Sequence, residues 1–216
     1  MRKLLVAILT LMAVTTDLWA GTPPWNPGYV ILPDGRKLEG QLNYNWKAEV
    51  VQVRLPDGLV KAYSAGYVDS FAYFDNAQQL IRQFSTVDMP VSDEELRPVF
   101  LEELAKGSLT VYRRLRHAHE LIKIARPMMY SDDSELVKDM DNFVYVVIDR
   151  EGQVFDLASF NKTLWPKMST YQQQLTQYLR GLLMDTSSTT ARLMLINQYN
   201  YLSLKQNTFA DTRTGE

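Results

Sequence analysis

The densest positive charge in the chain lies between residues 113 and 126. Arg114 and Arg116 are two residues apart, so on a β-strand they would share a face, with Tyr112 beside them. A guanidinium group can grip a carboxylate or a phosphate with two hydrogen bonds. We therefore expect Tyr112, Arg114 and Arg116 to bind an anionic glycan, a lipid headgroup or an acidic envelope protein. The alternative is a solvated strand face that balances the acidic stretch at residues 131–142.

A second candidate site is aromatic. Trp46 falls in a predicted turn between two strands, and Tyr44 precedes it by two residues. Aromatic rings exposed at the tip of a hairpin can stack on sugar rings. They can also fold back over the edge of the sheet, and the sequence leaves both interpretations open.

The residue types for metal or nucleophilic chemistry are sparse. His117 and His119 have a spacing that metals use on a strand, but they are the only histidines and the chain has no cysteine. Ser159 and Lys162 have the spacing of serine–lysine enzymes without the further motifs that those enzymes need. We predict no catalytic residue, no metal and no cofactor.

Carboxylates leave one enzymatic alternative open. Hydrolysis of a glycan or of peptidoglycan needs only two carboxyl groups at a suitable separation, which a sequence cannot show. Glu39, Glu49, Asp69 and Asp75 are free to serve, and no pairing among them can be assigned.

Composition gives the broad class. The chain has 216 residues, is 46% hydrophobic and 22% charged, and carries a formal net charge of −2. These values are ordinary for one globular domain with a substantial core, and the charge gives no reason to expect a nucleic-acid partner. The absence of cysteine excludes disulfides and a lipid-modified cysteine.

The first 20 residues have the pattern of an export signal. Arg2 and Lys3 are followed by the apolar run 4–14, and a cleavage site fits after Ala20. The run is too short for a stable membrane anchor, so we expect a soluble periplasmic or secreted product with no integral membrane segment after cleavage. A retained N-terminal anchor is the alternative.

One turn motif occurs twice and predicts the N-terminal architecture. Leu-Pro-Asp-Gly stands at residues 32–35 and 55–58, each time between runs of alternating polar and apolar residues. This sequence suits a type I turn closed by a glycine bulge, which reverses an antiparallel strand pair. We predict an antiparallel β-meander over residues 28–90 that forms a partly closed, barrel-like sheet. Residues 78–87 fit a strand and a helix equally well.

The middle of the chain, residues 91–157, predicts one helix and further hairpins. Ser92 to Glu95 has capping-box spacing, Pro98 suits a first turn, and Gly107 would end the helix. Strands are expected at residues 109–115 and 120–125, and the acidic stretch 131–142 is expected to be a mobile loop. Residues 143–157 form one more hairpin.

Helical periodicity appears only after residue 157. Residues 158–204 predict two to three helices, and the strongest apolar stripe runs from Tyr171 to Leu183. Strands first and helices last indicate an α+β fold. The expected organisation is a signal peptide (1–20), an extended lead-in (21–27), a single α+β domain (28–204) and a flexible tail (205–216).

Several short segments resemble those of a group of exported proteins. They read GYVILPDG at 28–35, LEGQL at 38–42, FLEELAKG at 100–107, LTVYR at 109–113 and NQYN at 197–200. The chain is similar in these to small exported proteins of unknown function from the Bacteroidota. The resemblance implies a location in the envelope of a Gram-negative cell and no mechanism. The expected role is a non-enzymatic binding or interaction module, and the alternative is the carboxylate hydrolase.

Overall fold

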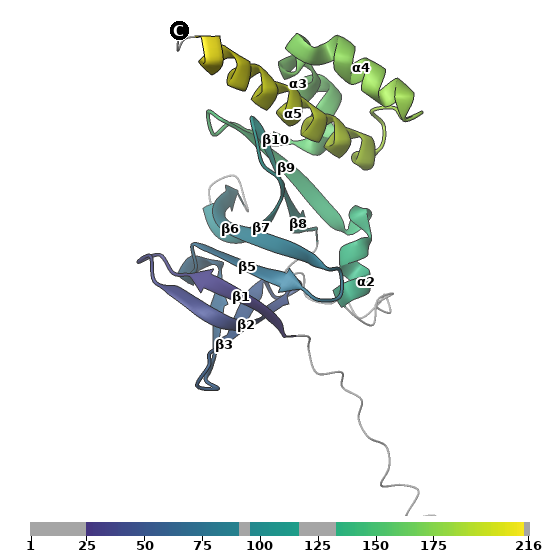
Figure 1. Ribbon diagram of the computed structural model, residues 1–216. Helices are drawn as coiled ribbons and strands as arrows, with labels where there is room; N and C mark the ends of the chain where they lie inside the picture. Colours follow the sequence, from purple (N-terminus) through teal and green to yellow (C-terminus); the bar gives the residue numbers. More distant parts are fainter. Residues whose placement is uncertain (1–24, 91–95, 117–132, 214–216) are drawn as a thin grey trace, which may run out of the picture.

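The computed structural model describes residues 25–90, 96–116 and 133–213, and only the backbone at 133–135 and 206–213. Ten strands form one antiparallel sheet, and the longer helices follow it in the chain (Figure 1), so the fold is α+β as predicted. The strands are β1 (Asn26–Ile31), β2 (Lys37–Asn45), β3 (Val50–Arg54), β4 (Val60–Ser64), β5 (Ser70–Asp75), β6 (Leu80–Pro90), β7 (Leu96–Ala105), β8 (Leu109–Leu115), β9 (Phe143–Asp149) and β10 (Val154–Asp156).

The sheet is a meander with one rearrangement. Its order is β10-β9-β8-β7-β6-β5-β1-β2-β3-β4, so β1 lies between β2 and β5. The two end strands, β4 and β10, are not paired with each other, and the sheet is therefore open rather than closed into a barrel. The predicted signal peptide and the predicted strand at 120–125 lie outside the described residues.

The two Leu-Pro-Asp-Gly turns have the predicted geometry. In each, the glycine N–H donates to the leucine carbonyl at 2.9 Å, and the glycine has a positive φ, 82° at Gly35 and 87° at Gly58. The turn at Asp149 to Gly152 repeats this arrangement, with φ of 80° at Gly152. Only glycine adopts this backbone conformation without steric cost, so these turns fix the register of their hairpins.

The helix predicted across residues 92–107 is wrong, because residues 96–105 form strand β7. Four consecutive residues of β7, from Val99 to Glu102, are buried, so both faces of the strand are covered. A strand buried on both faces has no alternating pattern and cannot be told from a helix by periodicity. The ambiguous segment 78–87 is likewise mostly strand, since β6 begins at Leu80.

The acidic stretch 131–142 is not a loop throughout. It contains helix α2 (Asp133–Lys138) and the 3₁₀ turn η2 (Met140–Asn142). Leu136 and Val137 are buried, and the side-chain amide of Asn142 donates to the carbonyl of Leu136 at 3.0 Å. Tertiary packing of two apolar residues thus orders a segment whose overall composition favoured a loop.

The main core lies inside the curved sheet and is aromatic. Tyr44 contacts Trp46, Phe71, Phe84 and Phe100 with ring centroids 4.8–5.9 Å apart. Trp46, at the β2–β3 turn, also reaches Phe143 of β9 at 5.5 Å, so the curvature brings distant strands of the sheet together. Edge-to-face and offset pairs of this kind add about 0.5–1.5 kcal/mol each beyond the burial of their area.

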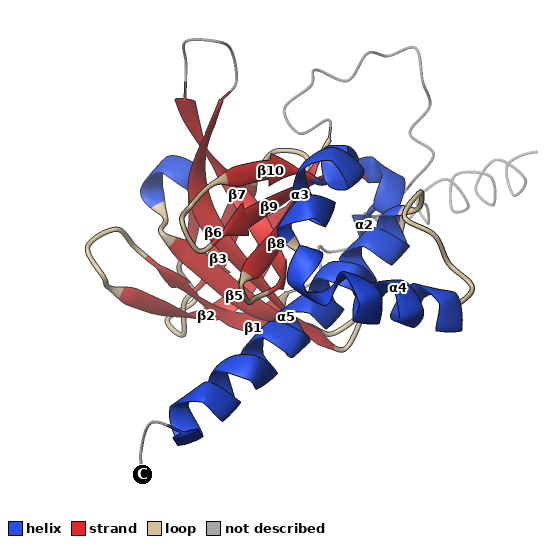
Figure 2. Ribbon diagram, turned by 90° about the horizontal axis from the view of Figure 1, so that it is seen from above, coloured by secondary structure: helices blue, strands red, loops and turns tan. Residues whose placement is uncertain are grey.

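The C-terminal helices pack at the β9–β10 end of the sheet, away from β1–β3 (Figure 1), and Figure 2 shows them from above. They are α3 (Phe160–Lys167), α4 (Gln172–Gly181) and α5 (Thr189–Arg213), with 3₁₀ turns η3 (Leu157–Ser159) and η4 (Ser169–Tyr171). The helical backbone of α5 continues past residue 205, where the flexible tail was expected to start. Among the described residues, none of the helices has the length and apolar character needed to cross a membrane.

Candidate functional site

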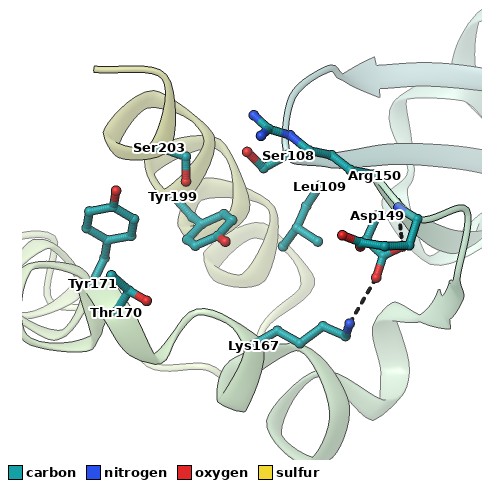
Figure 3. A pocket seen from close by; sticks show the side chains of 10 residues that line it. Ser108, Leu109, Asp149, Arg150, Lys167, Thr170, Tyr171, Tyr199 and Ser203 are labelled. Atoms are coloured by element: carbon teal, nitrogen blue, oxygen red, sulfur yellow. Dashed lines mark hydrogen bonds and ion pairs between the residues drawn. The ribbon is translucent and has the colours of Figure 1, made fainter. Parts of the chain in front are cut away.

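A pocket of about 380 Å³ opens where the helices meet the end of the sheet (Figure 3). Its walls come from the β7–β8 and β9–β10 turns, from the end of α3 with η4, and from α5. The lining residues are Ser108, Leu109, Asp149, Arg150, Glu151, Lys167, Thr170, Tyr171, Tyr199 and Ser203.

One wall holds a charge pair, Asp149 and Lys167. The Lys167 Nζ lies 2.9 Å from Oδ2 of Asp149, and Oδ1 of Asp149 accepts from the backbone N–H groups of Glu151 (3.1 Å) and Gln153 (2.8 Å). The bond from Lys167 holds the pKa of Asp149 below its ordinary value. Both oxygens of this carboxylate are engaged, and it stays ionised at neutral pH.

The opposite wall is built of rings and hydroxyl groups. Tyr171 of η4 and Tyr199 of α5 meet edge to face, with ring centroids 5.7 Å apart and planes at 73°. Ser203 lies one helical turn after Tyr199. Thr170 and Ser108 add two more hydroxyl groups from different segments. Half of the described lining residues are therefore polar but uncharged.

A side-chain clamp fixes α5 against the sheet beside the pocket. The Asn200 Oδ1 accepts from the N–H of Leu109 at 2.9 Å, and its Nδ2 donates to the carbonyl of Leu109 at 2.7 Å. Gly107 lies so close to this amide that a Cβ there would come within 2.4 Å of the Asn200 Cγ. Because Leu109 and Tyr199 both line the pocket, the clamp sets the spacing of its walls.

Arg114 and Arg116, which the sequence predicts to bind an anion, both form hydrogen bonds within the protein. Arg114 makes a bidentate contact to the buried carboxylate of Glu49, with Nε–Oε1 at 2.5 Å and a second nitrogen–oxygen distance of 3.0 Å. Arg116 donates to the backbone carbonyls of Asp141 and Phe143. Tyr112 is half-buried on the same strand. Binding of an anionic partner by these residues stays a prediction, and any such partner would have to compete with Glu49 for Arg114.

The nominated aromatic pair lies inside the protein. Tyr44 and Trp46 are only 8% and 4% exposed, because the β2–β3 turn folds over the core of the curved sheet. The prediction that they form an exposed contact for a ligand is therefore corrected. The open alternative, that the turn folds back over the sheet, matches their position.

Sequence reasoning missed a buried charge network under the Trp46 ring. Glu102 accepts from Arg82 and from Arg113 at 2.5 Å each, and Arg82 also donates to Asp75 at 2.7 Å. The guanidinium carbons of Arg82 and Arg113 both lie 5.7 Å from the centre of the Trp46 ring. Each residue looks like an ordinary surface charge in the sequence, so no local signal reveals the network.

The remaining chemical candidates do not assemble into a site within the described part of the chain. Residues 25–90, 96–116 and 133–213 contain no group of three or more His, Asp or Glu side chains placed to hold a metal. His117 and His119 lie outside the described residues. Among the carboxylates weighed for hydrolysis, Glu49 is bound by Arg114, Asp75 by Arg82 and Glu39 by Lys37.

The residues of the pocket gave only structural signals in the sequence. Asp149 lies in the predicted hairpin 143–157, and Tyr171 and Tyr199 lie in the region 158–204 that is predicted to be helical. Their polar ends converge only because α5 returns beside the β9–β10 turn, which local spacing does not encode. Comparison with protein-family models, with curated proteins and with solved structures finds no match for this chain, and its function has to be inferred from its own residues.

Proposed function

We propose that this protein is an exported, non-enzymatic binding module of the cell envelope, and that the pocket between the sheet and α5 is its binding site. The observation that carries the proposal is the make-up of the pocket. It joins aromatic rings and hydroxyl groups from three segments of the chain around a charge pair that is already neutralised. Small-molecule sites commonly have such a cavity with a few convergent polar groups.

The state of Asp149 supports binding rather than acid–base catalysis. A carboxyl group that acts as a general acid needs a raised pKa, whereas Lys167 lowers the pKa of Asp149. Two backbone N–H groups and one ammonium group also occupy its oxygens. Glu151, the other carboxylate of the pocket, lies on the same turn and is exposed. These properties favour the binding module over the carboxylate hydrolase.

The proposed location rests on the N-terminal sequence. Arg2, Lys3 and the apolar run that follows favour export with cleavage after Ala20, and the resemblance to exported Bacteroidota proteins points the same way. Expression of the full chain in a Gram-negative host, followed by fractionation and N-terminal sequencing, tests this. The expected product begins at Gly21 and is released by osmotic shock. A product that keeps residues 1–20 in the membrane fraction would overturn the location.

The binding site is tested by blocking it. Ser203→Phe places a large ring in the pocket, and Asn197→Phe places the same ring on an exposed position of the same helix outside it. Each purified protein is crosslinked to components of an envelope extract, and the adducts are mapped by mass spectrometry. We expect adducts at the pocket for the wild type and for Asn197→Phe but not for Ser203→Phe. If Ser203→Phe captures the same component as the wild type, the pocket is not the binding site.

A further inference from the structure

The pocket also indicates which ligand it would take, an inference that rests on the proposed function. Its volume of about 380 Å³ lies near the lower end of the range for small-ligand sites, about 300–1,000 Å³. The site is therefore large enough for one compact ligand unit.

Half of the described lining residues carry a hydroxyl group. Ser108, Thr170, Tyr171, Tyr199 and Ser203 each contribute one. A hydroxyl group both donates and accepts hydrogen bonds and rotates to suit its partner. A lining of this kind is complementary to a ligand whose own polar groups are hydroxyls, because donor and acceptor can be exchanged at every contact.

The charges of the pocket are balanced, which argues against an ionic ligand. The side chain of Asp149 is 6% exposed and bound to Lys167, so the positive charge of Lys167 is already balanced by a carboxylate. The exposed pair Arg150 and Glu151 on the adjoining turn also sums to zero. A charged ligand that displaced either partner would leave the other uncompensated, at a cost that grows with burial.

The tyrosine rings supply the apolar part of the surface. Tyr171 and Tyr199 meet edge to face, pack against the core and are half-buried, and both border the pocket. The negative face of an aromatic ring attracts the weakly positive C–H groups of a saturated ring. Among the described lining residues, Leu109 is the only aliphatic one and is itself buried, so these residues offer little to a wholly apolar ligand.

We propose that the pocket binds a neutral saccharide unit, with its C–H face against Tyr171 or Tyr199 and its hydroxyl groups bonded to the serine, threonine and tyrosine hydroxyls. The Asp149–Lys167 pair forms a fixed polar part of the wall and does not bind a charged group of the ligand. A neutral sugar satisfies the hydroxyl lining, the rings and the charge balance together, whereas an anion or a lipid chain satisfies only one of these.

The test uses a glycan array that carries neutral oligosaccharides beside matched uronic-acid and sialylated ones. The full chain purified after export is applied as the wild type, as Ser203→Phe and as the control Asn197→Phe. We expect the wild type and the control to bind neutral glycans, with affinity reduced at least about tenfold in Ser203→Phe, which corresponds to about 1.4 kcal/mol. Tyr199→Phe, which keeps the ring and removes its hydroxyl, should weaken binding less than Ser203→Phe.

The other outcomes separate the two proposals. Preference for the acidic glycans, or no glycan binding despite capture of an envelope component that depends on the pocket, would overturn the neutral saccharide and leave the binding module standing. Glycan binding that Ser203→Phe does not affect would overturn the pocket as the site. No binding that depends on the pocket, on the array or in the extract, would overturn both. Circular dichroism of each variant establishes that it is folded.

Discussion

The side-chain amide of Asn200 bonds both backbone groups of Leu109, at 2.9 Å to the N–H and 2.7 Å to the carbonyl. The pairing of β7 with β8 is irregular near this point and ends at Ala105 and Val111, so Leu109 has no partner in β7. Asn200 supplies the donor and the acceptor that a neighbouring strand would otherwise provide. One residue of α5 thus completes the sheet and holds the helix beside the pocket.

Replacement of Asn200 by alanine should destabilise the protein by about 2–4 kcal/mol. It removes two hydrogen bonds, and it leaves a buried N–H and a buried carbonyl without partners, each costing about 1–3 kcal/mol. Unfolding in urea, followed by circular dichroism, measures the change.

Asn197→Ala is the control, because Asn197 is exposed on the same helix. It should change the free energy of unfolding by less than about 0.5 kcal/mol. Asn200→Asp keeps the acceptor for the N–H of Leu109 but loses the donor for its carbonyl, and it should be at least as harmful as alanine. A stability for Asn200→Ala equal to that of the control would show that the clamp contributes little.

Gly107→Ala should also destabilise the protein, because the new methyl group would collide with the Asn200 side chain at 2.4 Å. The effect should depend on Asn200. In an Asn200→Ala background the collision is gone, and the same change should cost much less. A double-mutant cycle by urea unfolding measures this coupling, and additive effects would contradict it.

Gly181→Ala is the matched control for that cycle. It lies at the end of α4, and a Cβ there would meet nothing within 4 Å. Alanine favours helical backbone over glycine by up to about 1 kcal/mol, so this change should leave the stability unchanged or raise it slightly.

Glu102→Gln should be among the most destabilising single substitutions. Glu102 holds Arg82 and Arg113 in the interior, and the loss of its charge leaves two buried cations with only Asp75 between them. Removing one partner of a buried ion pair lowers the free energy of unfolding by about 3–5 kcal/mol. Glu103→Gln, at the next position of β7 and half-buried, is the control and should cost under about 1 kcal/mol. Equal urea midpoints for the two variants would contradict the role of the network.

Arg114→Lys tests whether the contact between Arg114 and Glu49 is needed for folding. Lysine keeps the positive charge but cannot reproduce the two parallel bonds to Glu49. We expect a loss of about 1–2 kcal/mol, less than for a fully buried group because Arg114 is 21% exposed. Arg180→Lys, at an exposed position of α4, is the control. If Arg114→Lys is as stable as the wild type, the contact to Glu49 is not needed for folding and the arginine is free for a partner.

The turns and the α+β class were predictable because local chemistry determines them. Pro, Asp and Gly in fixed order specify a turn wherever they occur, and the glycine φ values at residues 35 and 58 agree with this. The amphipathic stripe around Leu175 and Leu179 likewise predicted α4. Such features depend on neighbours within about four residues, which a sequence displays directly.

The site and the strand β7 were not predictable because they depend on contacts between distant segments. Asn200 and Leu109 are 91 residues apart, and Arg114 and Glu49 are 65 apart. Burial of β7 on both faces removed the alternation that would have marked it as a strand. Trp46 was placed at a turn, but the sequence did not show that this turn folds onto the core.

Alkaline pH should unfold the protein through its buried tyrosines. Burial raises the pKa of Tyr44 and of Tyr73, so the folded state keeps their protons while the unfolded chain loses them near pH 10. The free energy of unfolding is therefore unaffected by these groups below about pH 10 and falls as the pH rises further. Urea unfolding in steps from about pH 8 to about pH 11 measures the loss.

Tyr44→Phe and Tyr73→Phe should each flatten this decline, because phenylalanine keeps the ring and has no proton to lose. The exposed Tyr67→Phe is the control and should follow the wild type, and a decline of the same slope in all four proteins would contradict the assignment to buried tyrosines.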